Sequence, residues 1–227
     1  MSRPSIGLLV IGQAPRPALL AEFRHVLPES AADISVLGAL DHLDDAGLAA
    51  AAPESDADTL YTTLPTGRSV LVSKAAVTEG MGARLNDLAA QNVDVAIVAC
   101  TGRFKTLEAP GVHFASDLIG GAVAGCLPPG AGRLGVFIPT PAQAEASIER
   151  WSSAGRECVA VPVQPDADDA TIRAAAEEMA NHSVDLVVHD CISYTRASRL
   201  LAASIHRKPA ILAAAICARF AAELAGA

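Results

Sequence analysis

The stretch DVAIVACTGRF, residues 94–104, decides the fold that this sequence predicts. Residues 94–99 form a short apolar run rich in β-branched side chains, which is typical of a strand buried on both faces of a parallel sheet. Cys100 follows this run, so its thiol is expected at the carboxyl end of the strand, where open α/β sheets bind ligands. Backbone N–H groups in the next turn would stabilise a thiolate. The alternative is that Cys100 is a small core hydrophobe.

A second stretch, VDLVVHDCISYT at residues 184–195, repeats this pattern at a constant offset of 191 − 100 = 91. Upstream, the run IGLLV at residues 6–10 resembles LGVFI at residues 134–138. Each upstream run opens one half of the chain, and each half contains a later strand that carries a cysteine. This internal repeat predicts two α/β units, with Cys100 and Cys191 facing a common cleft.

We therefore expect an α/β fold of two pseudo-symmetric lobes, each a mostly parallel sheet flanked by helices. Lobe 1 is expected to span residues 1–111 and to be completed by 207–227, and lobe 2 to span 112–206. The first half carries the longer connection between its two matching strands. Two β-type runs that flank the turn residues 65–68 predict a hairpin there.

Composition excludes several classes of protein. Of the 227 residues, 51% are hydrophobic and 19% charged, which predicts a well-filled core, and the net charge of −8 argues against a nucleic acid partner. Five scattered cysteines without a CxxC motif indicate a reduced, cytoplasmic protein. The apolar run at residues 6–11 is too short for a signal peptide or a membrane span, so no membrane association is expected.

Two thiols on opposite sides of a substrate can move a proton without a cofactor. One thiolate removes the proton from a carbon beside a carboxylate, and a protonated thiol returns it on the other face, provided that their environments keep the pKa values apart. Cys100 and Cys191 are the catalytic candidates. Backbone N–H groups after each cysteine, an arginine fork and hydroxyl groups would bind the carboxylate. The expected substrate-binding residues are Gln13, Arg16, Thr101, Gly102, Arg103, Thr140, Ser193 and Tyr194. For Arg16, a solvated arginine at a helix start is the alternative.

Two polar residues precede Cys191. An ionised Asp190 would favour the protonated thiol and so suit a proton donor, although it could equally be a helix N-cap. His189 is expected to be either functional or a buried, hydrogen-bonded histidine. Ser116 and Asp117 are expected to cap a helix that ends near Cys126.

Other chemistries find little support in the sequence. The cysteines at 126, 158 and 217 lie in apolar or surface runs and are expected to be inert. No His/Cys/Asp cluster has the spacing of a zinc site, and no G-x-S-x-G motif is present. Gly80-Met81-Gly82 lacks the strand and the acidic residue that a dinucleotide-binding turn requires. We therefore expect neither a metal nor an organic cofactor.

The chain resembles the AroM family, a branch of the aspartate/glutamate racemase superfamily. The matching residues are Gly12-Gln13, Pro15-Arg16, Gly38-Ala39-Leu40-Asp41, Cys100-Thr101-Gly102, Phe104, Gly135-Val136, Pro139, Asp190-Cys191, Tyr194-Thr195, Ala218-Arg219 and Glu223-Leu224. The sequence departs from the family at Ala14, where a serine is expected, and at Ser193, where a glycine is expected. The resemblance implies a two-lobed fold with one cysteine from each lobe at the cleft, but no particular substrate.

Superfamily members include amino-acid and hydantoin racemases, maleate isomerase and a malonate decarboxylase. The leading hypothesis is a cofactor-independent isomerase or racemase that acts on a small carboxylate. A decarboxylase or other lyase at the same site is the nearest alternative, and a non-catalytic metabolite-binding protein is the hypothesis from another class, because fold does not imply function. The Ala-rich helices could support a homodimer.

Overall fold

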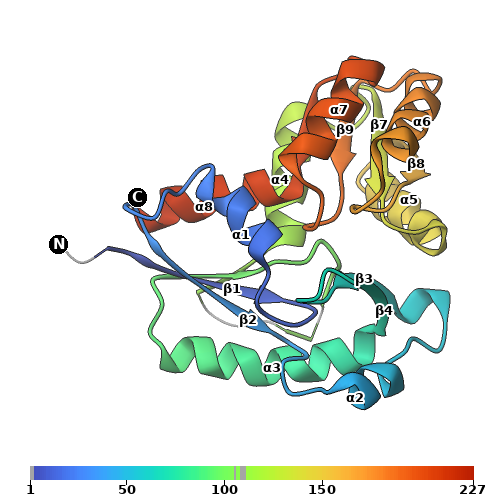
Figure 1. The fold of residues 1–227 in the computed structure, drawn as a ribbon. Coiled ribbons are helices and arrows are strands. Elements are labelled where there is room, and N and C mark those ends of the chain that lie inside the picture. The colour runs from blue at the N-terminus through green and yellow to red at the C-terminus, as the bar shows by residue number, and fades with distance from the viewer. Residues whose placement is uncertain (1–2, 105, 108–110) are drawn as a thin grey trace. The chain divides into compact units, whose positions relative to one another are not determined.

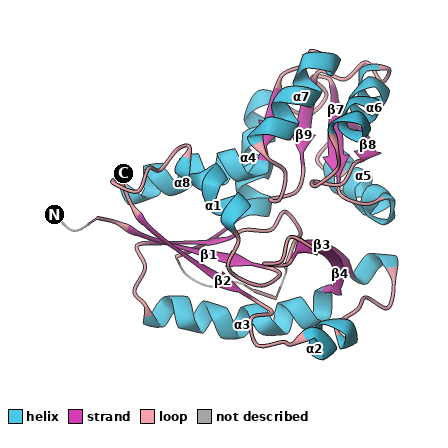
Figure 2. Ribbon diagram, in the orientation of Figure 1, coloured by secondary structure: helices cyan, strands magenta, loops and turns pink. Residues whose placement is uncertain are grey.

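The computed structural model describes residues 3–104, 106–107 and 111–227. The chain divides into two compact units, residues 1–118 with 217–227 and residues 119–216, which we call lobe 1 and lobe 2. Each lobe is an α/β unit built on a four-stranded sheet whose paired strands are all parallel. Figure 1 shows how the elements follow one another along the chain, and Figure 2 shows which are helices and which are strands.

In lobe 1 the strand order is β2-β1-β5-β6. The strands are β1 (Ser5–Val10), β2 (Asp33–Gly38), β5 (Val95–Val98) and β6 (Val112–Phe114). The helices are α1 (Pro17–Arg24), α2 (Asp45–Ala50), the 3-10 turn η1 (Asp56–Asp58) and α3 (Lys74–Ala90). All four residues of β5 are buried, as expected for a strand covered on both faces. The predicted hairpin is confirmed, because β3 (Thr59–Thr63) pairs antiparallel with β4 (Ser69–Ser73).

In lobe 2 the order is β10-β9-β7-β8. The strands are β7 (Arg133–Ile138), β8 (Glu157–Pro162), β9 (Leu186–His189) and β10 (Ala210–Leu212). The helices are the 3-10 turn η2 (Pro141–Gln143), α5 (Ala144–Ser152), α6 (Asp169–Ala180) and α7 (Arg196–His206). Two further helices, α4 (Ala115–Cys126) and α8 (Ala213–Ala225), each contain residues of both units.

Two local expectations at the start of α4 were wrong or incomplete. Ser116 and Asp117 are not N-caps, because α4 begins at Ala115 and places both residues in its first turn. The strand β6, whose three residues pair in parallel with β5, was not expected from the sequence. So short a strand leaves little periodicity in the sequence, and its pairing with β5 is a tertiary contact.

The structure confirms the internal repeat at the level of strand register. In lobe 1 Gly7 pairs with Ala96, and in lobe 2 Gly135 pairs with Val187. These partners differ by 135 − 7 = 128 and 187 − 96 = 91, and the neighbouring pairs of the same strands follow the same offsets. The two sheets therefore share one strand order, in which β1, β2, β5 and β6 correspond to β7, β8, β9 and β10.

Side-chain contacts repeat as well. A Cβ atom on Gly7 would overlap Leu88, and one on Gly135 would overlap Met179, which lies 91 residues after Leu88. The carboxylates of Asp94 and Asp185 each accept a backbone N–H from the first strand of their own lobe, at 2.7 and 2.8 Å. These shared contacts explain why the glycines and aspartates recur in the sequence.

Two glycines of α3 predict opposite effects on stability. A Cβ on Gly80 would overlap the backbone carbonyl of Ala39, which is not a flexible side chain and cannot easily move, whereas a Cβ on Gly82 meets nothing within 4 Å. Gly80→Ala should destabilise the protein by about 3 kcal/mol. Gly82→Ala should stabilise it by up to ~1 kcal/mol, because alanine favours the helix. Thermal unfolding followed by circular dichroism measures both, and equal melting temperatures for the two variants would contradict this packing. Because both glycines lie inside α3, they form no dinucleotide-binding turn.

Among the residues that the structure describes, no helix combines the length and apolar character needed to cross a membrane.

Candidate active site

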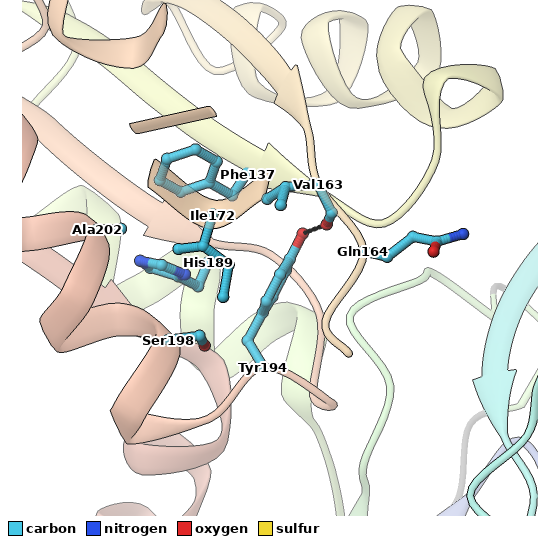
Figure 3. A pocket seen from close by; sticks show the side chains of 8 residues that line it. All are labelled: Phe137, Val163, Gln164, Ile172, His189, Tyr194, Ser198 and Ala202. Atoms are coloured by element: carbon cyan, nitrogen blue, oxygen red, sulfur yellow. Dashed lines mark hydrogen bonds between the residues drawn. The ribbon is translucent and has the colours of Figure 1, made fainter. Parts of the chain in front are cut away.

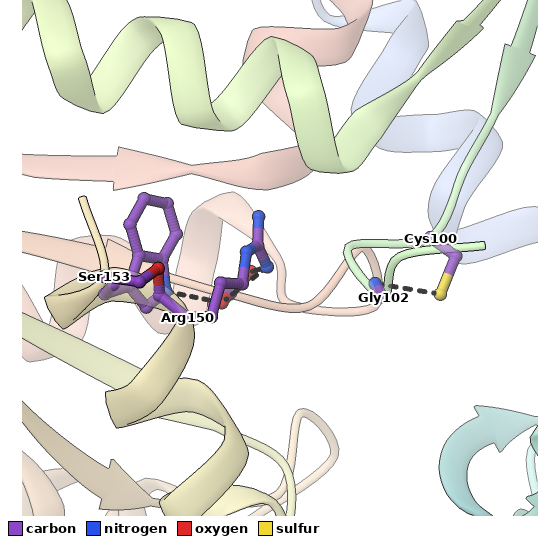
Figure 4. Close-up of polar contacts among 6 residues, drawn as sticks. Cys100, Gly102, Arg150 and Ser153 are labelled. Atoms are coloured by element: carbon purple, nitrogen blue, oxygen red, sulfur yellow. Dashed lines mark hydrogen bonds and ion pairs between the residues drawn. The ribbon is translucent and has the colours of Figure 1, made fainter. Parts of the chain in front are cut away.

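Cys100 lies two residues beyond the end of β5 and is 7% exposed. The backbone N–H of Gly102 donates a hydrogen bond to its Sγ at 3.3 Å, as the dashed line in Figure 4 shows. A donated N–H stabilises a thiolate more than a thiol. The tight turn that follows β5 thus supplies the anion-stabilising contact that the sequence predicted for Cys100.

Two residues that follow Cys100, Thr101 and Arg103, differ in how exposed they are to solvent. Thr101 is 9% exposed. The Arg103 guanidinium is largely exposed and forms an ion pair with Asp117 at 3.2 Å. Thr101 is thus enclosed with the thiol, whereas Arg103 lies at the protein surface.

The loop after β1 carries Gln13 and Arg16. The Gln13 amide donates to the carbonyls of Leu40 and Leu43, at 3.1 and 2.7 Å. Arg16 is 7% exposed and donates to the Thr62 hydroxyl at 3.2 Å, so it is not a solvated arginine at a helix start. A buried guanidinium keeps its charge, which makes Arg16 a suitable partner for a carboxylate.

Asp41 shapes the same loop. Its two carboxylate oxygens accept the backbone N–H groups of Ala14 and Gly38, each at 2.7 Å. This bridge explains the Gly38-Ala39-Leu40-Asp41 motif, because the aspartate ties the end of β2 to the loop that follows β1.

In lobe 2 the corresponding thiol, Cys191, lies two residues beyond β9 and is 8% exposed. Tyr194 and Thr195 end the loop that contains Ser193. The Tyr194 hydroxyl is buried and donates to the Val163 carbonyl at 2.5 Å. Thr195 caps α7 with a capping box. The tyrosine hydroxyl therefore supports the loop from inside lobe 2, and this contact adds nothing in favour of its predicted role in ligand binding.

Asp190 is not a helix N-cap. Its carboxylate is buried and accepts the indole N–H of Trp151 at 3.0 Å, and Arg150 forms an ion pair with it at 3.3 Å. The sequence could not show this arrangement, because Asp190 and α5 are about 40 residues apart in the chain.

His189 is buried, but the expectation that it would be hydrogen-bonded is wrong: among the described residues neither ring nitrogen has a partner. It lines a mostly apolar cavity with Phe137, Ile172 and Tyr194 (Figure 3). Burial, with smaller contributions from His206 and Arg199, lowers the pKa of His189 from 6.5 to about 3. The imidazole is therefore neutral at physiological pH.

Thr140 follows β7 at the position that corresponds to the loop after β1. It is 8% exposed, and within the described part of the chain its hydroxyl has no hydrogen-bond partner. A buried polar atom without a partner costs free energy, which a bound ligand can recover. Thr140 therefore remains a candidate for ligand binding.

The other three cysteines differ in their surroundings: one is buried, one is half-buried and one is exposed. Burial, together with the Asp190 carboxylate, raises the pKa of Cys158 to about 12, and burial raises the pKa of Cys217 to about 12. Cys126 is exposed on α4. In the described residues no group of three or more His, Cys, Asp or Glu side chains could hold a metal ion.

These environments predict the order of reaction with iodoacetamide. At neutral pH Cys100 should be alkylated faster than Cys158 and Cys217 by at least about tenfold, because only the thiolate reacts and a pKa near 12 makes it scarce. Peptide mapping by mass spectrometry after short exposures measures each rate. Faster labelling of Cys158 or Cys217 than of Cys100 would contradict this order.

The fold is that of the aspartate/glutamate racemase-like proteins. Among solved structures it is similar to arylmalonate decarboxylase (TM-score 0.64, 12% identity, covering 98% of this chain and 93% of that one). It is also similar to a maleate isomerase from Pseudomonas putida S16 (0.60, 15%, 97% and 91%) and to glutamate racemase from Campylobacter jejuni subsp. jejuni (0.59, 16%, 96% and 85%). A search of curated proteins finds no significant match.

The family follows from the sequence itself. A family model described as AroM protein matches residues 6–225, and the chain therefore belongs to the AroM family.

Proposed function

We propose that this protein is a cofactor-independent isomerase or racemase that acts on a small carboxylate through Cys100 and Cys191. The observation that carries the proposal is the equivalence of the two thiols. Each follows the third strand of its sheet in the shared order, at the ligand-binding edge, and the two lie 91 residues apart in matching registers.

The proposed chemistry is a proton transfer at the carbon beside the carboxylate. The Cys100 thiolate takes the proton, the C–H electron pair moves onto the carboxylate as an enediolate, and the Cys191 thiol returns a proton to the same carbon. The Gly102 N–H that bonds to Cys100 favours the thiolate form. In the reverse direction the two thiols exchange roles. Because only a proton is transferred, the step needs no oxidant or reductant.

The charge of Arg16 and the similarity to three carboxylate-using enzymes favour a small carboxylate as the substrate. Arg16 places a buried guanidinium in lobe 1, and Thr140 places an unpartnered hydroxyl in lobe 2. The names of the three similar enzymes specify an arylmalonate, maleate and glutamate, and all of these are carboxylates. The maleate isomerase structure contains maleate and a cysteine-to-alanine change.

The test is a screen of small carboxylic acids for exchange of a carbon-bound proton with D2O, followed by NMR. A positive acid should exchange in the presence of the protein, and prior alkylation with iodoacetamide should stop the exchange. Exchange that survives full alkylation of Cys100 and Cys191 would defeat the proposal.

A decarboxylase is the second candidate, favoured by the similarity to arylmalonate decarboxylase. In that reaction loss of CO2 leaves the same enediolate, which one thiol then protonates. Release of CO2 from a malonate-type acid, without exchange in monocarboxylates, would support the decarboxylase. Binding of an acid with neither reaction would support a non-catalytic metabolite-binding protein.

A further inference from the structure

The peptide that carries Cys191 is anchored by side chains on both sides. Upstream, the buried Asp190 carboxylate accepts the Trp151 N–H and pairs with Arg150, and the Asp190 backbone N–H donates to the Phe137 carbonyl at 3.0 Å. Downstream, the Tyr194 hydroxyl donates to the Val163 carbonyl. Cys191 is therefore held between two fixed points of lobe 2.

The equivalent peptide of lobe 1 keeps the backbone hydrogen bond, because the Ala99 N–H donates to the Leu9 carbonyl at 2.8 Å, but it lacks the side-chain anchors. At the offset of 91, Asp190 corresponds to Ala99 (190 − 91 = 99) and Tyr194 corresponds to Arg103 (194 − 91 = 103). Alanine has no polar group, and the Arg103 side chain is largely exposed. The two lobes therefore differ at this position, because Asp190 of lobe 2 has no counterpart carboxylate beside Cys100 in lobe 1.

We propose that Asp190 is a positioning residue for Cys191, and that its carboxylate, bound by Trp151 and Arg150 of α5, fixes the backbone from which the thiol projects. The inference rests on the proposed function in so far as Cys191 acts on a substrate. The Asp190 carboxylate is buried and paired, and removal of one partner of such a pair leaves an uncompensated charge, so Asp190, Trp151 and Arg150 hold this segment as a unit.

The side chains of the two residues before Cys191 lie on different sides of the sheet. The His189 ring faces a cavity that is also lined by residues of α6 and α7, whereas the Asp190 carboxylate binds α5. Successive side chains therefore point to opposite sides of the sheet, and each is immobilised by a different layer. The Arg150 guanidinium lies 4.6 Å from the centroid of the Trp151 ring, so the two donors to Asp190 also contact each other.

The experiment measures the rate at which iodoacetamide alkylates Cys191, relative to Cys100 in the same molecule. A buried thiol reacts from locally opened states, and loss of a hydrogen bond to a charged group increases their population by about tenfold. In Asp190→Ala the ratio of Cys191 to Cys100 labelling should therefore rise about tenfold. Trp151→Phe, which removes the N–H donor, should raise the ratio in the same direction.

Asp190→Asn separates positioning from charge. The amide oxygen can still accept the Trp151 N–H, although the ion pair with Arg150 is lost, so this variant should label more slowly than Asp190→Ala. If the asparagine and alanine variants label equally fast, charge rather than the hydrogen bond is responsible and the positioning role is overturned. Glu149→Gln, on the exposed face of α5, is the charge-matched control and should leave the ratio unchanged.

Trp151 is the single tryptophan of the chain, so its fluorescence reports whether each variant that retains it is folded in lobe 2. If the ratio of Cys191 to Cys100 labelling is unchanged in folded Asp190→Ala and in Trp151→Phe, the proposal is overturned. If Asp190→Ala does not fold, the ratio in Trp151→Phe decides. The measurement needs no substrate. Absence of proton exchange with every acid would therefore count against the proposed function but leave this inference to be judged by the labelling ratio.

Discussion

Cys191→Ala and Cys100→Ala should each lower turnover of a carboxylate found by the exchange screen by ~10²- to 10⁴-fold. This is the usual contribution of a positioned general acid or base, and in the proposed mechanism each thiol supplies one of these roles. The measurement is kcat/KM by NMR for both variants. Cys158→Ala is the matched control, because the high pKa of Cys158 makes that thiol a poor participant, and it should keep wild-type activity.

The two cysteine variants also distinguish the candidate reactions. An isomerase or racemase that uses two thiols loses activity in both variants. A decarboxylase that needs one proton donor loses activity in only one of them, so full turnover in either variant would remove the two-thiol mechanism. Both sites are buried, but alanine is close in size to cysteine and leaves only a small cavity, so folding should be preserved.

His189→Phe should make the stability of lobe 2 less sensitive to acid. The pKa of His189 is about 3 in the folded protein and 6.5 when unfolded, so between these values the unfolded state binds more protons. The stability that depends on neutral His189 is fully present above pH 6.5. It falls by about 1.4 kcal/mol per pH unit below pH 6.5, and this contribution is lost by pH 3. At pH 5 the wild-type protein should have lost about 2 kcal/mol relative to pH 7 through this residue alone.

Urea unfolding at pH 7, 6 and 5, followed by Trp151 fluorescence, measures this loss. His189→Phe retains a planar ring beside Phe137 and cannot be protonated, so its stability should fall less steeply than that of the wild-type protein. His182→Gln, a change at a partly exposed histidine of the same lobe, is the control and should retain the wild-type slope. Parallel slopes for His189→Phe and the wild-type protein would show that His189 is not buried and neutral as described.

Much of the fold was predictable because it depends on short apolar runs. The strands that precede Cys100 and Cys191 consist of hydrophobic residues except for His189, and a strand buried on both faces imposes that pattern directly. The glycine and aspartate that recur in each lobe also appeared in the sequence repeat, because close packing at Gly7 and Gly135 tolerates no side chain. The helix starts were predicted less well, since Ser116 and Asp117 were expected to cap α4 but lie in its first turn.

The surroundings of the candidate site were less predictable. Gln13 and Arg16 were expected to bind ligand, and the contacts that hold their side chains in lobe 1 were not predicted: they donate to Leu40, Leu43 and Thr62. Those acceptors are between 27 and 46 residues away in the chain. A hydrogen bond over such a separation leaves no periodic signal in a single sequence.

By itself, the sequence determined the two-lobed α/β fold, the internal repeat and the placement of one cysteine after a buried strand in each lobe. These features are local, because hydrophobic runs, turn residues and the spacing of the repeat are properties of neighbouring positions. Only the tertiary structure decided that Asp190 binds Trp151 and Arg150, that His189 is buried without a partner, and that Gly102 donates to Cys100. These three features depend on which side chains and backbone groups come into contact once the sheets and helices have packed. The order of the residues alone does not specify such contacts.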